Sequence, residues 1–147
     1  MNTLLSFEIA KLLKEKGFDA PCIYFFTENR ELYCLHPAES YNGFTPKNEF
    51  DLELDCEYPF EYNNLKAICK APTIAEVVMW CFNKYKYSIE YSMNIPESGE
   101  YDGCYVFNGL IKGSEDYKLK IFYTSKDYPT AEKALEDTIN HFLINFF

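Results

Sequence analysis

The chain has 147 residues, of which 48% are apolar and 25% charged, a composition that fits one folded domain and excludes a disordered chain. Its net charge is −9 and Arg30 is its single arginine, which argues against direct binding to nucleic acid or an anionic membrane and favours a basic protein partner. The longest apolar run, Val77–Phe82, is too short for a spanning helix and the first residues carry no basic leader, so we expect a cytoplasmic protein.

The N-terminal part of the chain predicts a helix followed by a β-hairpin. Apolar residues with the helical period run from Leu5 to Leu13, and Gly17 is suited to a helix end. The runs at 22–27 and 31–36 are β-branched and aromatic and flank a short polar turn. This pattern is typical of two antiparallel strands.

The middle of the chain predicts an irregular segment and then a second helix. Residues 37–70 are rich in turn-forming proline and asparagine, so we expect irregular connections around one extended piece at 49–58. Thr73 and Glu76 have the spacing of a capping box, which places a helix start there. The apolar stripe of this helix comprises Ile74, Val77, Val78, Cys81 and Tyr85, with Met79 on the opposite side and Trp80 at the margin.

The C-terminal part predicts three strands and a last helix. Apolar and polar residues alternate over 87–95, the period of a strand with one buried face. Two further strands at 104–111 and 117–124 follow turn signals, which indicates a meander. Pro129 is suited to the first turn of the last helix. The stripe of that helix comprises Ala131, Leu135, Ile139, Phe142, Leu143 and Phe146.

Together these elements predict a single α+β domain over residues 1–147. Its order is α-ββ-α-βββ-α, with an antiparallel sheet covered by helices on one face and an irregular acidic insertion at about 37–70. A double-stranded-RNA-binding fold has a similar α-βββ-α order, but acidic residues surround the start of the last helix, where such domains need basic ones. The predicted core comprises Ile74, Val77, Tyr87, Ile89, Tyr91, Leu135 and Ile139.

Three segments resemble a known family. They are SFEIAKLLKEKGFDAPCIYFF, APTIAEVVMWCFNKYKYSIEY and PTAEKALEDTINHFL, and they cover about half of the chain. They resemble a family of small uncharacterised proteins encoded by phages and mobile elements of gut Bacteroides-type bacteria. The matched positions are helix caps and core stripes. The resemblance therefore implies an intracellular phage or prophage product and carries over no catalytic residue.

A thiol and an imidazole lie close together in the predicted hairpin. Cys34 and His36 are two residues apart on a strand, so both side chains point to one face, as a nucleophile and its base or two metal ligands would. A half-buried strand explains the pair equally well, because no third ligand lies at a recognisable spacing. None of the six cysteines forms a CxxC pair, so we expect reduced thiols, no metal site and no cofactor. His141 lies off its helix stripe and is expected to face solvent.

The most distinctive segment is an acidic ladder in which carboxylates alternate with apolar residues. Its acidic members are Glu49, Asp51, Glu53, Asp55 and Glu57. On a strand they form a regular line of negative charge that can imitate a nucleic-acid backbone to a basic protein. A solvated edge strand that avoids aggregation explains the same pattern. A calcium loop ranks low, because Cys56 occupies the position where that loop needs glycine.

These observations favour a non-catalytic cytosolic binding protein of phage or mobile-element origin that acts through protein–protein contact, with the acidic ladder as its binding surface. The alternative from another class is a small enzyme that uses Cys34 with His36. Phe7, Ile144 and Phe147 have no obvious core position. They either pack on the domain's own loops or, exposed together, form a patch suited to a homodimer.

Overall fold

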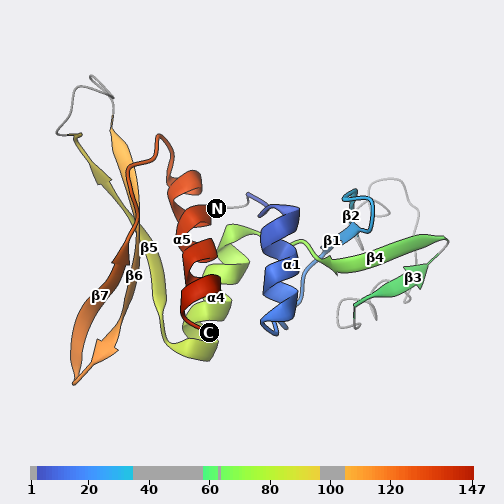
Figure 1. Cartoon of the computed structure of the whole chain (residues 1–147), viewed down its shortest axis with the longest axis horizontal. Coiled ribbons are helices and arrows are strands. Elements are labelled where there is room, and N and C mark those ends of the chain that lie inside the picture. The colour runs from blue at the N-terminus through green and yellow to red at the C-terminus, as the bar shows by residue number, and fades with distance from the viewer. Residues whose placement is uncertain (1–2, 35–57, 63, 97–104) are drawn as a thin grey trace, which may run out of the picture. The chain divides into compact units, whose positions relative to one another are not determined.

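The computed structural model describes residues 3–34, 58–62, 64–96 and 105–147. Within these residues the protein is α+β, as predicted, and its strands pair antiparallel in two sheets (Figure 1). The chain divides into two compact units, an N-terminal unit of Leu4–Thr73 and a C-terminal unit of Ile74–Phe147 together with the first three residues. The single domain expected over residues 1–147 stays a prediction.

The N-terminal unit packs one helix against a four-stranded sheet. Its elements are α1 (Phe7–Glu15), β1 (Tyr24–Thr27), β2 (Leu32–Cys34), β3 (Phe60–Tyr62) and β4 (Leu65–Lys70), and the strand order is β2-β1-β4-β3. Helix α1 begins where the Ser6 hydroxyl accepts a hydrogen bond from the Ile9 amide, and it ends before Gly17, whose φ of 84° suits glycine. Ala10 of α1 packs with Phe26 and Cys69 from the sheet.

Strands β3 and β4 lie in the segment expected to be irregular. Residues 37–57 and residue 63 of that segment lie outside the described residues. Strand β4 buries Ala67 and Cys69 completely. The sequence did not predict this strand, because these side chains are small and the neighbouring lysines interrupt the hydrophobic pattern. Strand β3 has only three residues. Strand β4 pairs with β1, which supplies large rings, and β3 joins the sheet by pairing with β4.

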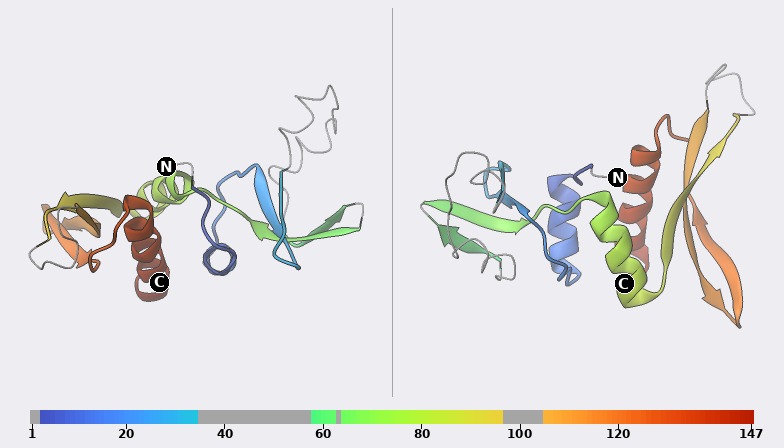
Figure 2. Two further views of the ribbon diagram at one scale, coloured as in Figure 1. Left: turned by 90° about the horizontal axis from the view of Figure 1, so that it is seen from above. Right: turned by 180° about the vertical axis from the view of Figure 1, so that it is seen from behind.

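The C-terminal unit covers one face of a three-stranded sheet with two helices. Its elements are α4 (Ile74–Tyr85), β5 (Ser88–Asn94), β6 (Val106–Glu115), β7 (Lys118–Thr124) and α5 (Ala131–Asn145), and the strand order is β5-β6-β7. Helix α5 packs across β6 and β5, while α4 packs against β5 and α5. Figures 1 and 2 show both helices on the same side of the sheet, which confirms the expected arrangement.

The core of the C-terminal unit follows the predicted stripes with one correction. The buried members are Ile74, Val77, Ile89, Leu135 and Ile139. Tyr87 is partly buried, and its ring meets the rings of Phe142 and Phe146 edge-on. Tyr91 was expected in the core but is 46% exposed. The predicted alternation of β5 is correct, since Ile89 and Tyr91 lie on the same face of the strand. The helices cover Ile89 more fully than Tyr91, which lies farther along that face.

Candidate functional site

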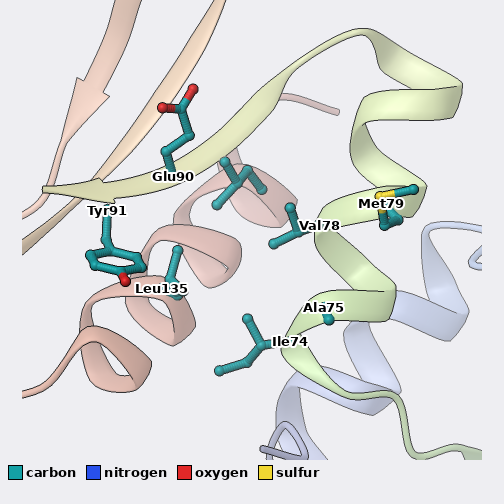
Figure 3. Close-up of a pocket in the computed structure, with 8 residues that line it drawn as sticks. Ile74, Ala75, Val78, Met79, Glu90, Tyr91 and Leu135 are labelled. Atoms are coloured by element: carbon teal, nitrogen blue, oxygen red, sulfur yellow. The ribbon is translucent and has the colours of Figure 1, made fainter. Parts of the chain in front are cut away.

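An apolar groove of about 500 Å³ opens between α4, α5 and β5 in the C-terminal unit (Figure 3). Its lining residues are Ile74, Ala75, Val78, Met79, Ile89, Glu90, Tyr91 and Leu135. In Figure 3, Val78 and Tyr91 point into the space between these elements, whereas the carboxylate of Glu90 points away from it. The volume falls within the range of about 300–1,000 Å³ that is usual for binding pockets. The groove can therefore take several apolar side chains.

The groove has a buried floor and an exposed rim. Ile74, Ile89 and Leu135 are at most 3% exposed and form the floor. Met79 is 59% exposed, because it lies outside the apolar stripe with which α4 packs against the core. Methionine is flexible and adapts to irregular partners, so its place on the rim suits contact with another molecule. The sequence placed Met79 away from the core but gave no sign that it borders a groove.

A row of exposed apolar side chains continues from the groove along β5. Tyr91 and Met93 share one face with Ile89, because successive residues of a strand point to opposite faces. Met93 is 55% exposed and Ile95, just after the strand, is 78% exposed. The sequence predicted that this face is buried. The groove and the row together form one apolar surface.

The opposite face of β5 is polar and carries Glu90. The Ser88 hydroxyl donates a hydrogen bond to the Glu90 carboxylate at 2.8 Å, and the Lys112 ammonium group donates one at 3.2 Å. The hydrogen bond from Ser88 has the largest effect and lowers the pKa of Glu90. Lys112 lowers this pKa as well, whereas partial burial raises it. Glu90 is therefore ionised at neutral pH and held by the neighbouring strand.

A second polar cluster joins α5 to β7. The Tyr123 hydroxyl donates to Asp137 at 3.1 Å, and the Tyr123 ring stacks on His141 with 3.7 Å between ring centroids. Burial, and then the Asp137 carboxylate, raise the pKa of Tyr128 to about 12. Phenols that stay protonated serve as hydrogen-bond donors, so this cluster holds α5 on the sheet. His141, which was expected to face solvent, is partly buried by the stacking.

The thiols with resolved pKa shifts are poor nucleophiles. Burial raises the pKa of Cys69 to about 11 and that of Cys81 to about 12. A thiolate is the reactive form of cysteine, so both thiols are inert at neutral pH. The main chain of Cys34 ends β2, but its side chain and the whole of His36 lie outside the described residues.

The acidic ladder also lies outside the described residues, since all five carboxylates fall within 35–57. The three apolar residues without an obvious core position are described. Phe7 packs edge-on against Phe26 in the N-terminal unit, and Phe147 stacks on Trp80 in the C-terminal unit. Ile144 is exposed. Two of the three therefore pack within their own units, and the homodimer stays a prediction.

Over the part of the chain that the structure describes, no group of three or more His, Cys, Asp or Glu side chains is placed to hold a metal ion. In the same residues no helix is both long and apolar enough to cross a membrane. No protein-family model, curated protein or solved structure matches the chain.

Proposed function

We propose that the chain is a non-catalytic cytosolic binding protein of phage or mobile-element origin, and that it acts through protein–protein contact. The observation that carries the proposal is the apolar surface of the C-terminal unit, in which the groove between α4 and β5 runs on along β5 into Tyr91 and Met93. Contiguous exposed apolar surface is typical of a site that another molecule covers.

The composition of this surface favours a protein partner. Its rim contains tyrosine and methionine, which are enriched in protein interfaces. The chain has a net charge of −9, so a basic partner is attracted at long range, while the apolar contact supplies affinity at short range. The resemblance of three segments to phage-encoded proteins supports the proposed origin.

Affinity capture with matched variants tests the proposal. The full-length wild type, Met79→Glu and Leu119→Glu are immobilised and exposed to cytosol from a gut Bacteroides-type bacterium. Met79 and Leu119 are both exposed apolar residues, but Leu119 lies on β7, outside the groove. We expect a protein that the wild type and Leu119→Glu retain and that Met79→Glu loses by about tenfold or more, because a buried unpaired charge is costly. Equal retention by all three proteins would refute the proposal.

The acidic ladder is the second surface that the same assay examines. Replacing Asp51, Glu53 and Asp55 with Asn, Gln and Asn removes three negative charges. If the ladder imitates a nucleic acid, the triple variant binds a captured basic protein more slowly and with a weaker dependence on salt. An unchanged association rate and salt dependence would instead identify the ladder as a solvated edge.

A further inference from the structure

We infer that the partner binds as an extended strand added to the outer edge of β5, which pairs with no other strand among the described residues, with alternate apolar side chains in the groove and lysine or arginine between them. This inference rests on the proposed function and specifies its mode of recognition. Addition of a strand to a sheet edge combines main-chain hydrogen bonds with pockets for every second side chain. The edge, the groove and the charges of the C-terminal unit each support it.

The register of the sheet shows which main-chain groups of β5 face outward. Phe107 exchanges hydrogen bonds with Tyr128, and the Gly109 carbonyl accepts one from the Ser125 amide, so both β6 residues direct their groups away from β5. Met93 lies opposite Phe107, and Tyr91 lies opposite Gly109. In an antiparallel pair, opposite residues either bond to each other or both point outward. The N–H and C=O groups of Tyr91 and Met93 therefore point to the outer edge.

The same alternation turns the main chain of Ile89 outward, so three residues offer a ladder for an added strand. Helix α5 packs mainly on β6 and then on β5, whereas the strand that α4 contacts most is β5, which places α4 toward this edge. A strand added to β5 would therefore run along α4. Its helix-facing side chains would enter the groove between α4 and β5, which the floor residues Ile74 and Leu135 close from below.

The two edges of this sheet differ in how they are protected. Strand β7 carries Lys118 and Lys120 at its edge, and the Lys120 ammonium group lies over the Phe122 ring at 5.4 Å. Lysines on an edge strand oppose pairing with another strand. The effect is strongest for a lysine that points toward the face of the sheet that the helices cover. Strand β5 has no lysine, arginine or proline among its residues Ser88–Asn94. Of the two edges that the described strands of this sheet leave unpaired, the β5 edge is therefore the one suited to an added strand.

The outer face of β5 determines the remaining positions of the partner. It presents Ser88, Glu90, Ser92 and Asn94, with Glu90 as its single charge. A neighbouring lysine or arginine on the added strand pairs with this carboxylate across the sheet. The net charge of −9 disfavours acidic residues at the same positions. The expected motif alternates apolar and basic residues.

Selection from a random display library of short peptides on the immobilised full-length protein tests the motif. We expect enriched peptides with apolar residues at every second position and Lys or Arg between them. Their affinity should fall by about tenfold or more for Met79→Glu, which puts a charge on the groove rim, and stay the same for Leu119→Glu. Enrichment without this alternation, or no enrichment, would overturn the inference.

N-methylation of an enriched peptide tests the main-chain pairing directly. Alternate amides of an extended peptide point to opposite edges, so one alternate set of N-methyl groups should reduce affinity by about tenfold or more while the other set is tolerated. If N-methyl groups at the apolar positions reduce affinity, the peptide binds antiparallel to β5. If N-methyl groups at the basic positions reduce affinity, it binds parallel to β5. Binding should also slow hydrogen exchange at the amides of Ile89, Tyr91 and Met93. Equal effects of both sets, or no protection of these amides, would refute strand addition.

The outcomes separate this inference from the proposed function. A protein captured in a Met79-dependent manner, together with peptides that show neither alternation nor amide protection, would leave the binding function standing and exclude the added strand. If no protein is captured but peptides bind as added strands, strand addition would stand and the proposed cellular function would be refuted.

Discussion

Gly109 lies where α5 crosses β6, and replacing it with alanine should destabilise the C-terminal unit by about 3 kcal/mol. A Cβ atom at this position would lie 2.6 Å from the Ala134 carbonyl oxygen and 2.9 Å from the Thr138 Cβ atom, and it would also collide with the Thr138 hydroxyl. Overpacking of a core costs about 1–3 kcal/mol. The upper end applies here, because the carbonyl belongs to the helix main chain and cannot rotate away.

Unfolding in urea, followed by the fluorescence of Trp80, measures this loss. Trp80 is the single tryptophan, is 5% exposed and belongs to the same unit as Gly109. A loss of about 3 kcal/mol moves the midpoint down by about 1 M urea or more. Ser114→Ala, at an exposed position of the same strand, is the control and should change stability by less than about 0.5 kcal/mol. A loss below about 1 kcal/mol for Gly109→Ala would show that α5 moves aside easily.

Three further predictions concern the core, the tyrosine cluster and the thiols. Ile139→Ala should cost about 2–5 kcal/mol in the same urea experiment, because Ile139 is fully buried; a loss below about 0.5 kcal/mol would contradict the packing. The pKa of Tyr128 is raised from about 10 in the unfolded chain to about 12 in the folded protein, so its contribution to stability should be complete below about pH 10. This contribution should be lost as the pH rises toward about 12. Asp137→Asn should lower the pKa of Tyr128, as measured by phenolate absorbance. Cys81 should resist alkylation at neutral pH until the protein unfolds, whereas a Cys34 that reacts far faster than the other cysteines would favour the enzyme alternative.

The helices were the most predictable part of the fold. The structure places α4 at Ile74 and α5 at Ala131, close to the starts that Thr73 and Pro129 predicted. Each helix buries a wide apolar stripe, so its period is visible over several turns of sequence. Strands β3 and β4 were missed, because β3 has only three residues and the buried residues of β4 are small. These residues become part of a sheet because β4 pairs with β1, far away in the sequence, and β3 pairs with β4.

The candidate site was less predictable than the fold. The sequence singled out residues that are rich in chemistry, the Cys34 and His36 pair and the acidic ladder, because motifs are recognised by residue type and spacing. The groove contains ordinary apolar residues from three elements, and none of them is unusual in its own segment. Tyr91 illustrates the difficulty, since its alternation with polar neighbours is the same whether a helix covers it or not.

The sequence by itself determined the α+β class, the helix stripes, the alternation in β5 and the negative charge, because each depends on local period or on composition. The tertiary structure decided how far the helices extend over the sheet, which edge carries lysines and which does not, and that Met79 and Tyr91 border one groove. These properties depend on distances between residues far apart in the chain. They are fixed when α4, α5 and β5 pack together, and no single segment records them.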